Sequence, residues 1–499
     1  MACSMRKYYF LVAALFICLI ILETFPLVFN LNRYIPGFFS TDESFAPLWE
    51  SWRLGYSFHH QLSLRSTNLV AYPFGVNLYP SGYISYLWFG LNFLLGLLVQ
   101  PALAYNIQVL ANIFLSGIFS YFLVYYITSI RLSAIFSGII FAFCPYQSVR
   151  SWQHLGLTFN QWIPLVIFLA IRLKNNDSKK NQLFFLLSLF LLFSFDWSVI
   201  FLTMAALFSF LIYYMVLYNW RAKFFRNRQG LAKLDFAYLR KVFFIGLAAF
   251  LIFLPQFLPA IKGRLSLSKS TPASVFSLVR RPFEDLFSQS ARPLSYFLPA
   301  SVHPVFGKFT ENFIGTSLYG ESLTEHTLYL GWVPLILAFV AFGIWRKKRK
   351  LSAIRYQLSA ENFYIDFFIF LALGAWFFSQ PPWWQIGTFK IYMPSFFIYK
   401  IIPMFRAYCR FGIVVMLAVA VLAGFGLKII LEGFKTRKTR IAITVLFCSL
   451  ALFEFWNWPP YKVIDVSRAP GVYYWLKRQP ADTVIAEYPL DLNGSNELH

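Results

Sequence analysis

The stretch LYLGWVPLILAFVAFGIW at residues 328–345, followed directly by RKKRK at 346–350, decides the fold of this chain. Residues 328–345 carry no charged side chain, and a helix of that length is about 27 Å long, close to the thickness of a bilayer's hydrocarbon core. Lysine and arginine beside a membrane-spanning helix are retained on the cytoplasmic side. The stretch therefore predicts a transmembrane helix that ends in the cytoplasm.

The same pattern recurs along nearly the whole chain. Hydrophobic residues make up 58% of the 499 positions and charged residues 13%, which excludes a water-soluble globule for most of the chain. The net charge of +23 does not indicate nucleic-acid binding, because the basic residues cluster in short loops between apolar runs, as at 221–228 and 435–440. We therefore expect the lipid bilayer, and no nucleic acid, as a partner.

The placement of charge predicts about eleven crossings of the membrane. Arg6 and Lys7 put the N-terminus in the cytoplasm and make the next apolar run a retained anchor. Further basic loops, expected on the same side, lie at 174–180, 219–241, 346–350 and 435–440. The predicted spans are 8–29, 102–127, 132–145, 156–173, two within 183–218, 242–259, 328–345, 364–380, 411–432 and 440–457.

One apolar run must not span the membrane. Four such runs lie between the first outer loop and Lys174, and an even number of crossings would leave Lys174 outside. We assign this role to 83–99, which contains Gly90 and Gly96, as a re-entrant or interfacial helix. The long polar loops then all lie outside, at 30–82, 144–161, 260–327, 381–410 and 458–499. The chain divides into a transmembrane domain, 1–457, and an extracytoplasmic C-terminal segment, 458–499.

Several chemistries lack support in the sequence. The five cysteines are far apart and form no C-x-x-C pair, so neither a disulfide framework nor a metal cluster is expected. Motifs for nucleotide or dinucleotide binding, zinc proteases and α/β-hydrolases are absent. Asp196 separates two apolar runs at the outer end of a predicted hairpin and is interpreted as a turn residue.

Asp42 and Glu43 are adjacent carboxylates in the first outer loop. Aromatic residues follow at near-helical spacing, which is typical of an amphipathic helix in the headgroup layer. One interpretation is that the acids cap this helix, since Ser-Thr-Asp-Glu is ordinary N-terminal chemistry. The other is that they are catalytic.

Arg150 and His154 lie four residues apart in an outer loop, on one face if that segment is helical. A guanidinium offers a planar fork that matches phosphate oxygens, so the pair could hold a lipid phosphate. The alternative is interfacial anchoring by Tyr146, Arg150 and Trp152.

Other charged residues stand where outer loops meet the membrane. Glu325 and His326 precede the span at 328–345, where charge is expensive unless it is paired or faces a wet cavity. Arg406 and Arg410 lie on the outer side, against the positive-inside bias, and Arg281 lies in the large outer loop. Their placement indicates either binding of an anionic headgroup or snorkelling to the interface.

These segments resemble the GT-C class of polytopic membrane glycosyltransferases, and more narrowly large bacterial members of it. The resemblance covers residues 8–457 and continues beyond them. It is carried by the acid after the first span and by YPFGVNL (72–78), FAFCPYQSVR (141–150), HLGLT (154–158), QWIPL (161–165), EHTLYLGWVPL (325–335) and APGVYYWLKRQP (469–480). It implies an all-α polytopic bundle with a large first outer loop, in a bacterial-type plasma membrane.

The resemblance also implies chemistry. The donor in this class is a sugar on a polyprenyl phosphate or pyrophosphate, used outside the cell, and transfer usually inverts the anomeric carbon. Asp42 matches the class's acid, a general base or metal ligand, and Glu43 supplies the second carboxylate of a D-E pair. The resemblance leaves open whether Asp42 binds a divalent metal ion. Arginines that could steady the departing phosphate are Arg150, Arg281, Arg406 and Arg410, and His154, Glu325 and His326 are further candidates for substrate binding.

The C-terminus departs from the class, whose members carry a soluble outer domain there. This chain has one predicted helix, at about 471–478, and one strand-like run, 483–488. A single strand has no partner, so we expect a truncated chain or an element packed on the outer loops. Two functions remain: transfer of a sugar from a lipid-linked donor to an extracytoplasmic glycan, lipid or protein, or a non-enzymatic role as a flippase or scaffold for envelope polysaccharide.

Overall fold

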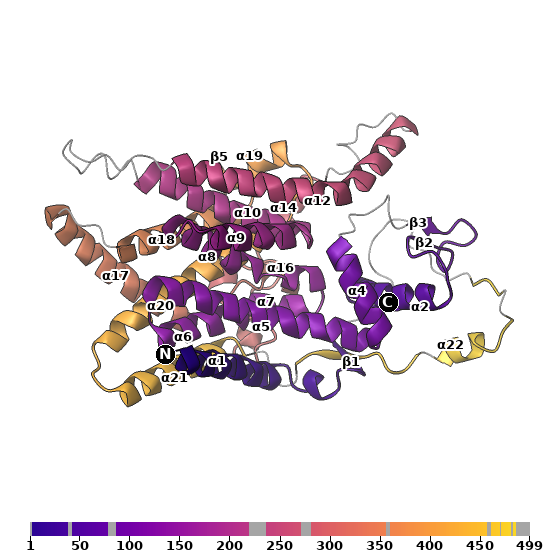
Figure 1. Ribbon diagram of the computed structural model, residues 1–499, viewed down its shortest axis with the longest axis horizontal. Coiled ribbons are helices and arrows are strands. Elements are labelled where there is room, and N and C mark those ends of the chain that lie inside the picture. The colour runs from indigo at the N-terminus through magenta and orange to yellow at the C-terminus, as the bar shows by residue number, and fades with distance from the viewer. Residues whose placement is uncertain are drawn as a thin grey trace.

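The computed structural model describes residues 2–37, 42–77, 86–218, 236–270, 281–355, 360–456, 461–469, 471–480 and 483–485. Its long helices run side by side along one axis (Figure 1). They are α1 (Ala2–Glu23), α5 (Pro101–Thr128), α6 (Arg131–Ala142), α8 (Trp162–Asn175), α9 (Lys179–Phe193), α10 (Trp197–Ile212), α12 (Phe236–Ser270), α17 (Trp332–Arg355), α18 (Ala360–Ser379), α20 (Gly412–Glu432) and α21 (Arg437–Glu454). Each predicted span coincides with one of them.

Not all of these helices meet the requirements of a membrane span. Within the described ranges, six segments are long and apolar enough to cross, and a seventh would be α6 joined to α7 (Pro145–Ser151), which is bent from it by 42°. The helix α9 has only 15 residues, and α21 carries three basic residues in its first turn. The number of eleven crossings therefore stays a prediction.

The helix α20 forms the centre of the bundle. Every residue from Gly412 to Leu427 is buried, as expected for a helix that is apolar on all sides. It packs against α5, α6, α17 and α18. In a membrane, the hydrophobic effect does not drive helices together, so small residues that allow close backbone packing are favoured at their interfaces. Gly426 lies against the Leu337 carbonyl of α17. Ser137 Oγ of α6 donates a hydrogen bond to the Ala420 carbonyl at 2.8 Å.

The helices α2 (Asp42–His59) and α4 (Tyr86–Leu98) form a lobe at the right of Figure 1. The helix α4 has 13 residues and is about 20 Å long. Residues 78–85, directly before it, lie outside the described part of the chain, so the assignment of 83–99 as the run that does not span stays a prediction. The two helices touch backbone to backbone, because a Cβ on Gly55 would lie 2.5 Å from the Gly96 carbonyl oxygen. This contact fixes the direction of α2, whose first residue is Asp42.

Short strands occur in the loops of the transmembrane domain, which was expected to be all-α. Strand structure was expected only in the C-terminal segment. Strand β1 (Tyr34–Pro36) pairs antiparallel with β6 (Val463–Asp465), and Arg33 Nη2 holds Asp465 Oδ2 at 2.7 Å across this pair. The other ladders are β2 (Ser66–Thr67) with β3 (Val76–Asn77) and β4 (Trp383–Ile386) with β5 (Phe389–Tyr392). The six strands found among the described residues all lie in the predicted outer loops.

The C-terminal segment was predicted incorrectly in one respect. The helix expected at about 471–478 is present as α22 (Gly471–Leu476). The strand expected at 483–488 is not one in its described part, 483–485, and 486–488 lie outside the described residues. The strand that does form is β6, because the first outer loop supplies β1 as its partner.

Short elements connect the long helices at the predicted outer face. Those that bear on the site below are α7, η2 (Leu155–Thr158), α14 (Asp285–Ser288), η4 (Pro293–Tyr296), α16 (Leu323–His326), α19 (Pro394–Ile401) and η5 (Tyr408–Phe411). Two further elements at this face are η1 (Leu27–Phe29) and α15 (Gly307–Glu311), whereas η3 (Tyr213–Tyr218), a π-helix, continues α10 toward the predicted cytoplasmic loop at 219–241.

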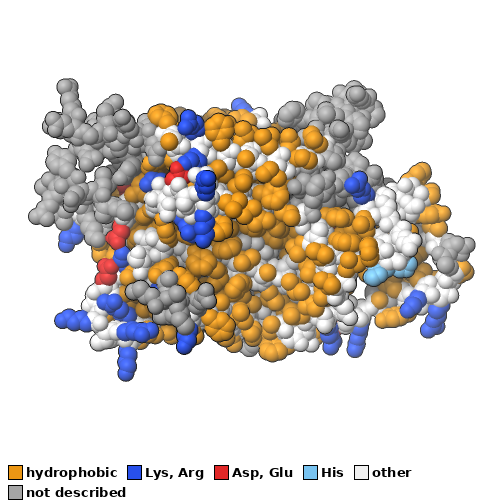
Figure 2. All heavy atoms as spheres, in the orientation of Figure 1, with side chains coloured by type: hydrophobic (Ala, Val, Ile, Leu, Met, Phe, Trp, Pro, Cys, Tyr) orange, Lys and Arg blue, Asp and Glu red, His pale blue; other side chains and the backbone are white. Residues whose placement is uncertain are grey.

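The surface matches a molecule embedded in lipid. Figure 2 shows hydrophobic side chains over most of the middle of the visible face, with lysine and arginine toward both ends. Exposed large apolar residues line the outward sides of the helices, for example Phe243 at 64% and Phe339 at 68%. In water such a continuous apolar surface would cause aggregation, whereas in a bilayer it contacts acyl chains.

The α2–α4 contact can be tested by adding a side chain. Gly96→Leu should lower the free energy of unfolding by about 1–3 kcal/mol, because the side chain must push α4 off the α2 backbone. Gly90→Leu is the matched control in the same helix, since a Cβ there meets nothing within 4 Å. Thermal unfolding of the purified protein in detergent compares the two. Equal stability of both variants would contradict the close contact.

Candidate functional site

A buried ion pair joins two loops that lie far apart in the sequence. The Arg150 side chain of α7 is completely buried, and it donates two hydrogen bonds to Glu325 of α16. Arg150 Nη1 lies 2.9 Å from Glu325 Oε1, and Nη2 lies 2.6 Å from Oε2. This bidentate geometry is the strongest form of charge-assisted hydrogen bond between these groups.

A second arginine shares the same carboxylate. Arg410, in η5, donates from Nη2 to Glu325 Oε1 at 2.7 Å and from Nε to the same oxygen at 3.2 Å. Its remaining nitrogen, Nη1, donates to Ser198 Oγ at 2.9 Å, at the start of α10. Cys409 Sγ also donates to Glu325 Oε2 at 2.9 Å. We call Arg150, Glu325, Arg410, Cys409 and Ser198 the arginine–glutamate network.

The network carries an excess of one positive charge. Two guanidiniums flank one carboxylate, and their fields together hold the pKa of Glu325 well below its usual range, although its burial acts in the opposite direction. The Arg150 side chain is fully buried and the Arg410 side chain is 18% exposed. Arg410 is therefore the more exposed cation of the network.

Local structure fixes both ends of the Arg150–Glu325 pair. Pro145 begins α7 directly after α6 ends, because proline lacks the N–H that would continue the preceding helix and is favoured in a first turn. The ring of Tyr146 lies under Arg150, with the guanidinium carbon 5.1 Å from the ring centre. On the other side, Ser322 caps α16 by accepting from the Glu325 amide at 3.2 Å.

His154 lies just beyond α7 and keeps a helical connection to it, because its amide donates to the Arg150 carbonyl at 2.9 Å. Burial first, and then the Arg150 charge, lowers the pKa of His154 to about 3. The ring is therefore neutral at physiological pH. The sequence suggested that Arg150 and His154 could together hold a lipid phosphate; of the two, only Arg150 carries a charge here.

Asp196 is the turn residue that the sequence predicted. It caps α10 by accepting from the Ser198 amide at 2.7 Å. A Cβ on Gly156, in η2, would lie 3.1 Å from Asp196 Oδ2, so the α9–α10 turn packs against the segment after His154. This packing places Ser198 beside Arg410.

Arg406 and Arg281 belong to a second, more exposed cluster. Arg406 Nη1 lies 2.9 Å from Asp285 Oδ2 of α14, and the two side chains are 38% and 23% exposed. The Arg281 amide donates to the Pro403 carbonyl at 3.0 Å, and Tyr399 Oη donates to the Arg281 carbonyl. The structure thus separates the four candidate arginines into a buried pair and an outer pair.

His326 is held by the backbone. The Ser322 amide donates to Nδ1 at 3.1 Å, and Nε2 lies 3.2 Å from the Ser290 carbonyl oxygen. Both contacts are met by a neutral ring protonated at Nε2. Burial is the main reason that the pKa of His326 is lowered. Its contacts indicate a structural role in shaping the turn that carries Glu325.

The side chains of Asp42 and Glu43 lie outside the described part of the structure. The chain that leads to them is described as far as Gly37, where a Cβ would lie 3.6 Å from the Trp152 carbonyl oxygen. Trp152 is two residues from Arg150. Asp42 follows Gly37 by five residue steps, and such a stretch reaches at most about 18 Å.

A divalent metal does not fit the arginine–glutamate network, because both oxygens of Glu325 already accept from guanidiniums and the network is positive. Among the described side chains, no three His, Cys, Asp or Glu groups come together as metal ligands. Asp42 and Glu43 are outside that set, so a metal held by them stays an expectation from the class resemblance.

The sequence identified the charged members of the network but not their partners. Ser198 and Cys409 were missed; the available signals were that Ser198 follows the turn residue Asp196 and that Cys409 precedes Arg410. The requirement that Glu325 be paired was recognised, whereas the identity of its two arginine partners depends on contacts 175 and 85 residues away in the sequence.

Comparisons with known proteins find the fold in solved membrane glycosyltransferases. The oligosaccharyltransferase of Archaeoglobus fulgidus matches with a TM-score of 0.51 and 13% identity over 89% of this chain and 54% of its own length. The arabinofuranosyltransferase AftD from Mycobacteria matches with a TM-score of 0.51 and 14% identity over 95% of this chain and 28% of its own. No family model and no curated protein matches the sequence.

Both solved structures are GT-C glycosyltransferases, and the expected resemblance to that class is confirmed at the level of the fold. This chain spans about half the length of the first protein and just over a quarter of the second. At these identities the likeness concerns the fold alone.

The ion pair makes a prediction about stability. Glu325→Ala should lower the free energy of unfolding by about 3–5 kcal/mol, because it leaves buried Arg150 without a counter-charge. The double variant Arg150→Met, Glu325→Met should lose less stability, because buried Arg150 and its counter-charge Glu325 are removed together. Thermal unfolding in detergent measures both. A double variant as unstable as Glu325→Ala would contradict the charge argument.

The lowered pKa of His154 predicts acid sensitivity. Between about 3 and its unfolded value near 6.5, the unfolded chain binds a proton that the folded chain does not, so stability falls as pH falls, by about 1.4 kcal/mol per pH unit. Glu325 adds a further loss only below its own unfolded pKa of about 4.3.

His154→Gln should therefore flatten the loss of stability between pH 6.5 and 5, measured by thermal unfolding. His59→Gln, a change at an exposed ring on α2, should leave the slope as in the wild type. An unchanged slope in His154→Gln would show that another group controls it.

Proposed function

We propose that this chain is a membrane glycosyltransferase that moves a sugar from a polyprenyl-phosphate-linked donor to an acceptor on the extracytoplasmic face. The observation that carries the proposal is the partly exposed side chain of Arg410, whose guanidinium is held by Glu325 and Ser198 in a network with an excess positive charge. Further support comes from the fold, which is shared with an oligosaccharyltransferase and an arabinofuranosyltransferase.

Arg410 is the group best suited to a lipid phosphate. Its fork of donors matches phosphate oxygens, and the excess charge of the network attracts an anion. Glu325 and Ser198 fix its orientation before a ligand arrives, so little reorganisation is needed on binding. The class resemblance supplies the identity of the anion as a polyprenyl phosphate or pyrophosphate.

Buried polar atoms beside Arg410 support a polar ligand. Arg150 Nε and Tyr146 Oη are buried and form no hydrogen bond among the described residues. An unpaired buried donor costs about 1–3 kcal/mol, a cost that a phosphate oxygen or a water would remove. Arg150 otherwise acts as a positioning residue, because both of its terminal nitrogens hold Glu325.

His154 suits a different task from the arginines. Because its ring is neutral, it can donate a hydrogen bond to a sugar hydroxyl or a phosphate oxygen without adding charge. The outer cluster of Arg281 and Arg406 lies nearer to solvent. In this proposal it meets the donor headgroup on its way to Arg410.

The proposed reaction needs a base on the acceptor side. An acceptor hydroxyl oxygen attacks the anomeric carbon, the bond from that carbon to the phosphate oxygen breaks, and its electron pair stays on the phosphate. The hydroxyl proton passes to a carboxylate, which the class resemblance assigns to Asp42, with Glu43 beside it. Arg410 offsets the charge that develops on the leaving phosphate. Either a hexose or a pentose fits this scheme.

The alternative of a flippase or scaffold predicts charges spread along a route through the bundle. Three charged side chains, two of them buried (Arg150 and Glu325) and one partly exposed (Arg410), instead converge at one place, from segments that the sequence assigns to one face. Convergence of this kind is what a transferase requires, so the transferase is the function proposed here.

Two variants separate the proposed roles. Asp42→Asn should abolish sugar transfer while donor binding remains, because only the base is removed. Arg410→Gln should weaken binding of polyprenyl phosphate by about 10- to 100-fold, the effect of losing a hydrogen bond to a charged group. Binding and transfer are measured on purified protein with polyprenyl-phosphate sugars. Arg150 still pairs with Glu325 in Arg410→Gln, so folding should be retained, as thermal unfolding can verify.

The control is Glu311→Gln, which removes an exposed carboxylate from another outer loop. It should transfer sugar like the wild type. Normal transfer by Asp42→Asn would refute the assignment of the base. Unchanged phosphate affinity in Arg410→Gln, together with a loss in Arg406→Gln, would move the phosphate site to the outer cluster.

A further inference from the structure

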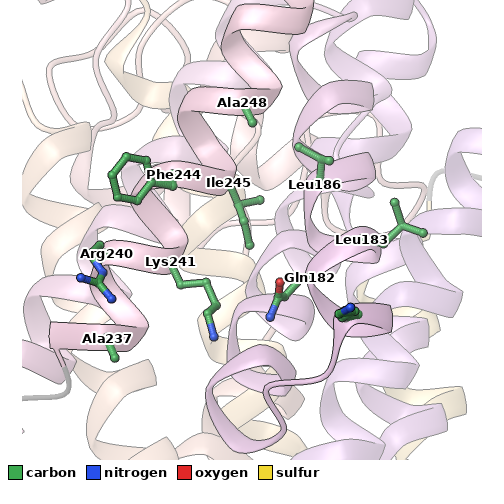
Figure 3. Close-up of a pocket in the computed structure, with 10 residues that line it drawn as sticks. Gln182, Leu183, Leu186, Ala237, Arg240, Lys241, Phe244, Ile245 and Ala248 are labelled. Atoms are coloured by element: carbon green, nitrogen blue, oxygen red, sulfur yellow. The ribbon is translucent and has the colours of Figure 1, made fainter.

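A groove separates α9 from α12, away from the arginine–glutamate network. Its volume is about 550 Å³, and Figure 3 shows its lining side chains on the two helices. The apolar wall consists of Leu183, Leu186, Phe244, Ile245 and Ala248. The groove begins at Lys179, the first residue of α9, and the network begins at Ser198, beyond the end of α9. The groove lining extends along α9 as far as Leu186, so the rest of that helix, about 10 Å, lies between the groove and the network.

The mouth of the groove is basic. Lys179, Arg240 and Lys241 line it together with Gln182. Lys241 is paired with Asp177, to which Gln182 also donates at 2.8 Å. Within the described residues Lys179 and Arg240 form no ion pair, and both are exposed. Two cations are thus free to meet an anion at one end of an apolar wall.

The groove lies at the end of the molecule that the sequence assigns to the cytoplasm. The loops 174–180 and 219–241 are basic in the sequence, and these two helices begin there. Anionic headgroups are enriched in the cytoplasmic leaflet and are attracted by basic residues beside membrane helices. Basic pockets between helices on this side are sites where such headgroups bind.

We propose that this groove binds one anionic phospholipid, with its phosphate between Lys179 and Arg240 and an acyl chain along the apolar wall. The occupant is a lipid rather than a soluble anion because the charged mouth continues into a wall of aliphatic and aromatic side chains. Binding of this lipid is independent of the sugar donor, which the proposed function places at the opposite end of α9.

Native mass spectrometry of the full chain in neutral detergent provides the test. The probes are phosphatidylglycerol and phosphatidylcholine with the same acyl chains, each added without sugar donor. The wild type should retain phosphatidylglycerol at least about tenfold more strongly, since the anionic headgroup meets two cations. The variant Lys179→Gln, Arg240→Gln should lose this preference. Because no donor is present, absence of sugar transfer would not affect the result.

Two further variants distinguish a site from general attraction. Arg437→Gln, Lys438→Gln removes the same charge from exposed positions at the start of α21 and should retain the preference. Ala248→Phe fills the groove with all charges intact and should reduce binding of the lipid. An equal loss in the α21 control, full binding in Ala248→Phe, or displacement of the lipid by inorganic phosphate would each overturn the proposal.

Discussion

The arrangement of the outer loops depends on one carboxylate placed between two guanidiniums. A buried arginine or glutamate is unfavourable alone, because its charge is removed from water. Arg150 and Glu325 satisfy each other through two hydrogen bonds, and Arg410 joins them from a third segment. The three segments must therefore be held together in the folded state. Because two arginines share one glutamate, the network has one positive charge in excess. Arg410 is the arginine that remains partly exposed.

The helix bundle makes this arrangement stable. The central helix α20 is buried along most of its length, and it begins directly after Arg410. The kink after α6 turns α7 so that Arg150 faces Glu325, and the capped turn of α16 presents that carboxylate. The position of Arg410 thus depends on packing inside the helix bundle, since movement of α20 would move Arg410. The pairing of β1 with β6 brings the C-terminal segment to the same region.

Much of the fold could be predicted because the helices follow local rules. Apolar runs of membrane length, separated by basic loops, indicated the position of each long helix, although α12 and α17 extend about ten residues beyond the predicted spans. The even number of runs before Lys174 required that one of them not span, and the glycines of 83–99 were the reason for choosing that run. Local rules also indicated that Glu325 needs a partner and that Asp196 is a turn. They could not identify Arg150 and Arg410 as those partners, because this depends on how distant helices pack. The strand β6 was missed for the same reason, since its partner lies more than 400 residues away.

The central claim is that the positive network serves a reaction at a lipid-linked phosphate. It is tested most directly by incubating the purified protein with a panel of polyprenyl-phosphate sugars and an acceptor mixture, and by following release of polyprenyl phosphate with time. The account predicts release from at least one donor, with the sugar recovered on an acceptor. Movement of intact donor between leaflets, without cleavage of the sugar–phosphate bond for any sugar in the panel, would contradict it.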